Sequence, residues 1–126
     1  MAKSVAERHE IVERYLGLVA SGTAAQIMEL YAAEPTLEDP VGSAPRVGRA
    51  AVEEFYESIQ DLETETTLRE FHGSGDNAAA FAFDVVTKTG DLSVAVSAIE
   101  VMEFDDAGKI THMRAYWHAD TDMTMS

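Results

Sequence analysis

The sequence predicts one α+β domain in which three helices precede an antiparallel β-sheet. Apolar residues recur at helical spacing up to residue 59. From residue 63 onward they alternate with polar residues, in runs separated by turns rich in Gly, Asp and Asn. The 126 residues suffice for one core, so residues 1–126 are predicted to form a single domain. Helices followed by strands favour a sheet with one face covered by the helices.

The three helices are predicted over residues 4–20, 23–33 and 49–59. Ser4 followed by Glu7 is a capping-box pattern at the start of the first helix, and Gly22 ends that helix. Pro35 is expected to stop the second helix, because proline cannot continue the backbone hydrogen-bond pattern. The apolar face of the second helix is expected to include Tyr31.

The extended segments are predicted over residues 36–39, 63–71, 78–87, 92–104 and 110–118. Residues 42–48 are predicted to form a loop, and turns are predicted at residues 73–77, 89–91 and 105–109. The tail, residues 119–126, shows no periodicity and is expected to be loosely held.

Composition excludes several function classes. The 9 basic and 23 acidic residues give a formal net charge of -14, which repels nucleic acids and anionic membrane surfaces. There is no cysteine, and the four histidines are scattered, so no metal site is predicted. No segment has the apolar core of a signal peptide or the length of a membrane span, so a cytoplasmic location is expected.

Asp39 is the first candidate catalytic residue. Pro40 holds it in an extended conformation, and it shares strand parity with Leu37 while Glu38 points the other way. Asp39 is therefore expected to face the apolar side of its strand. The alternative is that it caps the Pro-Val-Gly turn that follows, because Asp is common in such turns.

Glu100 is the second candidate. It is the only acid among the residues of its strand that share one face of the sheet, which are Val94, Val96, Ala98, Glu100, Met102 and Phe104. A carboxyl group there is expected to stay protonated and to donate a hydrogen bond. The alternatives are a partly solvated face, or a pair between Glu100 and Arg114 across the hairpin.

Three tyrosines, Tyr15, Tyr31 and Tyr56, lie on the apolar stripes of the three predicted helices. They are either ordinary core residues or members of a hydroxyl network beside Asp39 and Glu100. A base and neutral donors around an apolar cavity suit proton removal next to a carbonyl group and stabilisation of the resulting enolate.

The chain resembles bacterial ketosteroid isomerase (steroid Δ5-isomerase), a member of the NTF2-like and SnoaL-like superfamily. The matching segments occur in order and cover nearly the whole chain; they are Arg14-Tyr15, Leu30-Tyr31-Ala32, Glu38-Asp39-Pro40-Val41-Gly42-Ser43 with Pro45-Arg46, Glu54-Phe55-Tyr56, Ala80-Phe81-Ala82-Phe83 and Met113-Arg114-Ala115. The resemblance implies a curved sheet wrapped by three helices into a cone, an apolar steroid pocket inside the cone, and a homodimer.

The resemblance also implies residue roles. Asp39 matches the general base that moves a proton from C4 to C6 of a 3-oxo-Δ5-steroid, and Tyr15 matches the phenol that binds the C3 oxygen. Glu100 stands where the familiar members have a protonated aspartic acid, so it differs from them by one methylene group. The supporting tyrosines are Tyr31 and Tyr56, and the substrate-binding positions are Phe83, Trp117 and Met113.

The expected activity is therefore a steroid isomerisation that needs no cofactor. Two alternatives remain: a polyketide cyclase or hydrolase-like relative that uses Asp39 on another enolisable ligand, and a binding module without catalysis. Turnover of larger fused-ring polyketides, without turnover of steroids, favours the cyclase interpretation. An Asp39→Ala variant with unchanged ligand affinity and unchanged activities favours the interpretation as a binding module.

Overall fold

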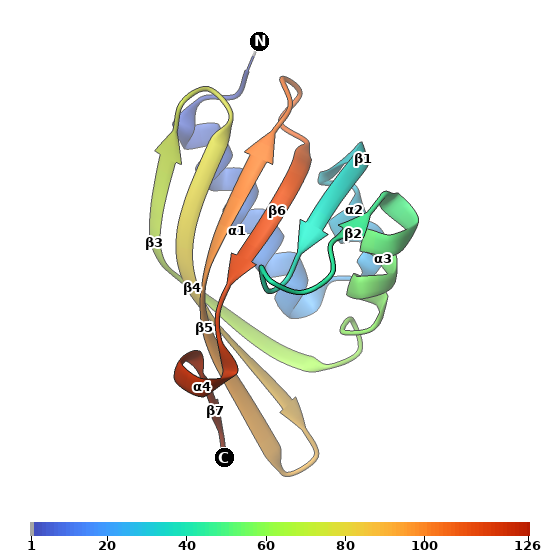
Figure 1. The fold of residues 1–126 in the computed structure, drawn as a ribbon, viewed down its shortest axis with the longest axis vertical. Helices are drawn as coiled ribbons and strands as arrows, with labels where there is room; N and C mark the ends of the chain where they lie inside the picture. Colours follow the sequence, from blue (N-terminus) through green and yellow to red (C-terminus); the bar gives the residue numbers. More distant parts are fainter. Residues whose placement is uncertain (1) are drawn as a thin grey trace.

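A curved, unclosed β-sheet forms the body of the protein (Figure 1). The structure is a computed structural model that describes residues 2–126. Its strands are β1 (Tyr31–Glu38), β2 (Arg46–Val47), β3 (Glu63–Ser74), β4 (Ala78–Thr89), β5 (Leu92–Phe104), β6 (Ile110–Tyr116) and β7 (Met123–Met125). The strand order is β2-β1-β6-β5-β4-β3, with β7 paired to β5, and within residues 2–126 the sheet has seven strands. The β1–β6 pair is parallel and the other strand pairs are antiparallel.

Helices cover one side of this sheet, which confirms the predicted α+β class (Figure 1). They are α1 (Val5–Ser21), α2 (Ala24–Met28) and α3 (Arg49–Glu57), and a short α4 (Ala119–Asp122) follows β6. The capping box of α1 is confirmed: the Glu7 N–H donates to Ser4 Oγ at 3.1 Å, and the Ser4 N–H donates to Glu7 Oε1 at 2.8 Å. Gly22 ends this helix as predicted, donating its N–H to the Leu18 carbonyl.

Arg8 fastens α1 to the hairpin between β3 and β4. Its side chain is 3% exposed although it carries a charge. The guanidinium donates to backbone carbonyls of Lys3, Ser74, Gly75 and Ala78. These backbone oxygens replace the water molecules that the guanidinium loses when it is buried. The helix that carries Tyr15 is held in a fixed position over the sheet.

The second helix is much shorter than predicted, and Tyr31 does not belong to it. The chain turns after Met28, and Tyr31 begins strand β1, where it pairs with Ile110 of β6. Pro35 lies inside this strand, at a register irregularity between Tyr31 and Thr36, and it does not end a helix. Pairing with β6, 79 residues away, overrides the local helical pattern, and proline is tolerated because the ladder is irregular there.

Two further segments differ from the prediction. Residues 46 and 47, expected in a loop, form the short strand β2 beside β1. The tail forms α4 and β7, and β7 pairs with residues 94–96 of β5. The absence of periodicity predicted no structure there, but three residues suffice for a strand when a neighbouring edge is available. β6 ends at Tyr116, two residues before its predicted end.

The outer face of the sheet exposes large side chains, with Ile99 53% and Tyr116 47% exposed. The homodimer expected from the family resemblance stays a prediction. None of the helices described is both long enough and apolar enough to span a bilayer.

Candidate active site

A cavity of about 130 Å³ opens on the helix-covered face of the sheet. Its lining residues are Asp39, Phe83, Val85, Val96, Ala98, Glu100, Ala115 and Trp117. Larger depressions lie elsewhere on the surface; one, of about 260 Å³ beside α1, is lined largely by charged side chains such as Lys3 and Arg14. The smaller cavity is the better candidate site because it combines apolar walls with two acids, as ligand sites commonly do.

Asp39 enters the cavity from the end of β1. Its Oδ1 accepts a hydrogen bond from the indole Nε1 of Trp117 at 2.8 Å. The turn after Asp39 is closed by Ser43, whose N–H donates to the Pro40 carbonyl at 3.1 Å. Asp39 therefore faces the apolar side, as its parity with Leu37 predicted, and its carboxylate bonds to Trp117.

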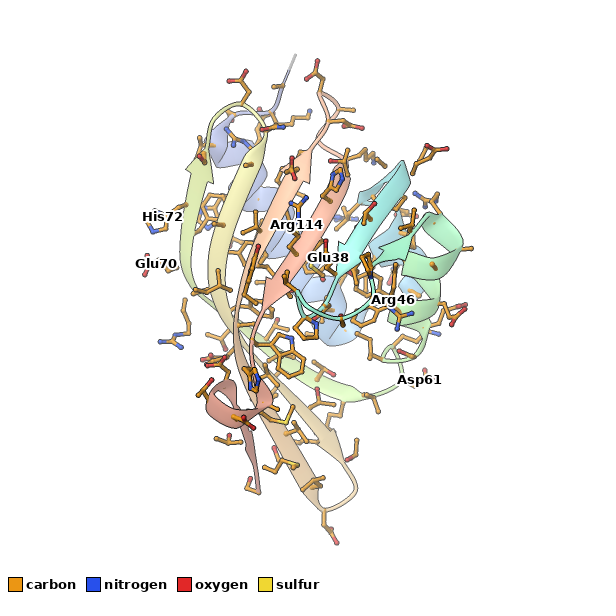
Figure 2. The ribbon with its side chains drawn as sticks, in the orientation of Figure 1. Glu38, Arg46, Asp61, Glu70, His72 and Arg114 are labelled. Carbon is orange, nitrogen blue, oxygen red and sulfur yellow. The ribbon has the colours of Figure 1, made fainter. Side chains whose placement is uncertain are left out.

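Burial raises the pKa of Asp39, because the charged form loses water. Two groups act in the opposite direction and lower this pKa: the Trp117 donor and the positive charge of Arg46. Arg46 lies on β2, beside α3 (Figure 2), and its guanidinium stacks over the Phe55 ring at 5.3 Å from the ring centroid. Asp39 is thus held in a mostly apolar place by one donor and one nearby cation.

Glu100 is 3% exposed, in the middle of β5, and its Oε1 has no hydrogen-bond partner among residues 2–126. Burial, and then the negative charge of Asp39, raise the pKa of Glu100 well above its ordinary value. The alternative pair with Arg114 is not formed: Arg114 instead donates to Glu103 Oε2 at 2.7 Å. Both effects favour the protonated form of Glu100.

The three tyrosine hydroxyls form a buried chain. The hydroxyl oxygen of Tyr56 is 2.8 Å from that of Tyr15 and 2.6 Å from that of Tyr31. Burial is the largest cause that raises the pKa of each phenol above its ordinary value. All three therefore remain neutral donors, as the hydroxyl-network prediction required, although Tyr31 reaches the network from a strand.

The structure brings most of the predicted site residues together. Asp39, Glu100, Phe83 and Trp117 line the cavity. Tyr15 is 3% exposed and is not among the residues that line this cavity. It lies close enough for the charges of Glu100 and Asp39 to raise its pKa.

Met113 is fully buried in the core and does not line the cavity either; it lies between Leu37 and Met102 in the sheet register. The wall residues that sequence reasoning did not assign to the site are Val85, Val96, Ala98 and Ala115. Strand parity points to three of them, because Val85 shares a face with Phe83, and Val96 and Ala98 share one with Glu100. Ala115 follows only from the register, which places it opposite Glu100.

The arrangement can carry out acid and base chemistry in an apolar hollow. An ionised carboxylate can take a proton, and a neutral carboxylic acid can donate a hydrogen bond to an oxygen that becomes negative. Within residues 2–126, no group of three or more His, Asp or Glu side chains is placed to hold a metal ion.

Comparisons with known proteins agree with this fold. Residues 12–113 match the SnoaL-like domain family. A protein of Nocardioides simplex named Steroid Delta-isomerase is 46% identical over 121 residues, which is 96% of this chain and 97% of that protein.

Two solved structures have similar folds. One, described as the epoxide hydrolase/cyclase-like enzyme SalBIII in pyran ring formation in polyether salinomycin, is 29% identical, with a TM-score of 0.88 over 95% of this chain and 96% of its own. The other, RV0760c from Mycobacterium tuberculosis, is 23% identical, with a TM-score of 0.85 over 92% of this chain and 93% of its own, and shows the fold alone.

Proposed function

The chain belongs to the SnoaL-like domain family of the NTF2-like superfamily, and we propose that within it the protein is a steroid Δ5-isomerase. In this reaction the C5–C6 double bond of a 3-oxo-Δ5-steroid moves into conjugation with the ketone. The relative named Steroid Delta-isomerase, at 46% identity, supports an isomerase activity. The observation that carries the proposal is the pair of Asp39 and Glu100 on the wall of one apolar cavity. Burial raises the pKa of both acids, the charge of Asp39 raises the pKa of Glu100 further, and Trp117 and Arg46 lower the pKa of Asp39.

Asp39 is the general base in this proposal. Its carboxylate takes a proton from C4, and the electrons of the broken C–H bond form a C3–C4 double bond while the C3 oxygen becomes negative. Asp39 then returns the proton to C6, and the double bond ends between C4 and C5. The proton goes back to the substrate and no electron is gained or lost, so these steps balance without a cofactor. Trp117 and Arg46 limit the rise in the pKa of this carboxyl group and so favour its ionised form in the free enzyme.

Glu100 and Tyr15 are the proposed donors to the C3 oxygen. Glu100 has an unpartnered oxygen and keeps its proton, so it can donate as the negative charge develops. If Tyr31 donates to Tyr56 and Tyr56 donates to Tyr15, the proton of Tyr15 is left free for a ligand. Each hydroxyl in this chain then polarises the next one.

The cavity also limits the ligand. Its remaining walls are apolar side chains, which suit a neutral hydrocarbon skeleton. At about 130 Å³ it is smaller than the roughly 300–1,000 Å³ usual for ligand sites, so only the reacting ring of a steroid is proposed to enter it. The other rings of a steroid lie outside this volume or require the walls to move apart.

A second candidate is an epoxide opening, which the similarity to SalBIII favours. Here Asp39 takes the proton of an attacking hydroxyl or water, a new C–O bond forms, and Glu100 protonates the oxygen of the C–O bond that breaks. The same two acids serve both reactions, so the substrate decides between them.

The experiment mixes the purified protein with 5-androstene-3,17-dione and follows enone absorbance. Rapid growth of the absorbance, lost in Asp39→Asn, supports the isomerase. Failure of the wild-type protein to produce enone overturns it. Ring closure of a hydroxy-epoxide by the same sample then supports the second candidate, and binding of a phenolic steroid without turnover of either substrate supports a binding module.

A further inference from the structure

The C-terminal segment, residues 118–126, takes no part in the chemistry above, yet it continues directly from a cavity wall. The last registered pair between β5 and β6 joins Ile99 to Tyr116. Trp117 follows that pair and lies outside every strand of the described chain. Its indole nevertheless bonds to Asp39 and lines the cavity. The β-ladder alone therefore does not fix the residue that holds the base.

His118 connects Trp117 to α4 through four hydrogen bonds. Its N–H donates to Asp122 Oδ2 at 2.8 Å, and its Nδ1 accepts the N–H of Asp120 at 3.1 Å. Its carbonyl accepts the N–H groups of Thr121 at 3.2 Å and of Asp122 at 2.8 Å. The residue after Trp117 is thus tied to the helix on both its backbone and its side chain.

Strand β7 then ties α4 to the sheet. It pairs with residues 94–96 of β5, the part of β5 that lies beyond its pairing with β6 (Figure 1). Ser93 and Ser126 exchange both backbone hydrogen bonds, each at 2.9 Å. Val96, which faces Met123 in this register, is itself a cavity wall residue. The segment therefore joins two walls of the cavity, one formed by Val96 and the other by Trp117.

We propose that residues 118–126 are a positioning element that holds the Trp117 indole against Asp39. The role of this element in turnover rests on the proposed function, whereas its effect on Trp117 can be measured without any substrate. Docking of β7 fixes α4, α4 fixes His118, and His118 fixes the backbone of Trp117. When β7 detaches, the indole leaves Asp39, and the base becomes harder to ionise because it loses its hydrogen-bond donor.

The other titratable groups near Asp39 lie outside this segment. They are Arg46 of β2, Glu100 of β5, Tyr15 of α1 and Tyr31 of β1, with Tyr56 of α3 bonded to both phenols. A change in the ionisation of Asp39 after a substitution in β7 therefore reports the loss of the hydrogen bond from Trp117.

The test uses two proline substitutions in the full chain. Because Ser93 and Ser126 form a hydrogen-bonded pair, the antiparallel alternation makes Ala95 and Thr124 the next such pair and leaves Met125 with its N–H outside the ladder. Thr124→Pro therefore removes a ladder donor, and Met125→Pro, one residue away, is the matched control. Asp122→Ala removes one of the four hydrogen bonds between His118 and α4 without touching the ladder, and it serves as a second variant if Thr124→Pro does not fold.

Trp117 is the only tryptophan, so intrinsic fluorescence reports its environment directly. Thr124→Pro and Asp122→Ala are expected to shift the emission to longer wavelength and to increase quenching by acrylamide, while Met125→Pro resembles the wild type. The acid limb of the kcat/KM profile should move to higher pH, with roughly tenfold lower activity on that limb.

Folded Thr124→Pro or Asp122→Ala protein with wild-type emission, quenching and acid limb overturns the positioning role. An inactive wild-type protein overturns the proposed isomerase instead, and the fluorescence comparison still decides the role of the segment.

Discussion

The indole Nε1 of Trp117 donates a hydrogen bond to Oδ1 of Asp39 at 2.8 Å, across 78 residues of sequence. Asp39 leaves the end of β1, and Trp117 leaves the end of the neighbouring strand β6. The two side chains meet because these neighbouring strands run parallel, so both finish at the same end of the sheet. This contact opposes the effect of burial on the pKa of Asp39 and favours the ionised form of its carboxyl group in an apolar cavity.

Replacing the Trp117 donor should change the pH dependence of activity. In Trp117→Phe the aromatic wall remains, but the bond to Asp39 is lost, so the pKa of Asp39 rises further above its ordinary value. Because the ionised form is the base, the acid limb of kcat/KM should move to higher pH by about one unit. A pH series of initial rates measures this shift. An unchanged acid limb contradicts the assignment of Asp39 as the titrating base held by Trp117.

Removing the charge of Asp39 should abolish most turnover and spare binding. Asp39→Asn is expected to lower kcat by about 10²–10⁴-fold, because an amide cannot accept the C4 proton. Affinity for a phenolic steroid that resembles the dienolate should persist, as measured by fluorescence titration. Glu38→Gln is the matched control, since Glu38 is the neighbouring acid and does not line the cavity. Loss of both binding and turnover in Asp39→Asn indicates a folding defect.

The hydrogen-bond donor at position 100 should matter more than its acidity. Glu100→Gln is expected to reduce kcat far less than Glu100→Leu, because the amide can still donate to the C3 oxygen, whereas leucine cannot. Loss of one such donor costs about 10²–10³-fold in rate. Steady-state kinetics of both variants on the same steroid make the comparison. Equal losses contradict the role of Glu100 as a neutral donor.

Glu100 should also shape the pH dependence of stability. Its pKa is raised in the folded state, so its contribution is fully present below its ordinary value of 4.5 and is lost as pH rises toward the folded-state pKa. The free energy of unfolding should fall by about 1.4 kcal/mol per pH unit across that window, and Glu100→Gln should remove this fall. Urea unfolding at a series of pH values measures it.

Glu103, on the same strand, provides a control of opposite sign. The hydrogen bond from Arg114 lowers its pKa, so its contribution is present above pH 4.5 and is lost as pH falls. If Glu100→Gln leaves the profile of the wild type intact, Glu100 is not a buried neutral acid.

Tyr56 should be the most sensitive of the three phenols. Tyr56→Phe removes both hydroxyl contacts of the network and leaves two buried phenols without a partner, so we expect a loss of about 2–4 kcal/mol in unfolding free energy. Tyr31→Phe removes one contact and should cost about 1 kcal/mol. Tyr116→Phe, on the exposed outer face, is the control and should be close to neutral. Thermal or urea unfolding that ranks Tyr31→Phe above Tyr56→Phe contradicts the central position of Tyr56.

Local patterns predicted the elements that are long and regular. The β5 prediction, residues 92–104, coincides with the observed strand because an alternating run is bounded there by two turns. The capping box placed the start of α1. Strand parity alone placed Asp39 and Glu100 on apolar faces, since side chains of a strand alternate regardless of what the strand pairs with.

Local patterns failed where a distant partner decides. The second helix was predicted too long because Leu30 and Tyr31 continue its apolar spacing, yet β6 recruits Tyr31 into a strand. The tail showed no periodicity because β7 has three residues and is defined by its pairing with β5. Met113, which the family resemblance and not a local pattern assigned to the substrate, is fully buried and pairs with Leu37 and Met102 in the register.

The sequence by itself determined the class of the fold, the face on which each acid lies and the chemistry that an isolated carboxyl group on an apolar face can perform. Only the tertiary structure decided that Asp39 bonds to Trp117, that Tyr56 joins the other two phenols, and that Oε1 of Glu100 has no hydrogen-bond partner among residues 2–126. Side-chain alternation and helix caps arise between residues a few positions apart, so they can be read along the chain. Contacts between residues tens of positions apart depend on which strands pair and in what register, and those choices are made by the fold as a whole.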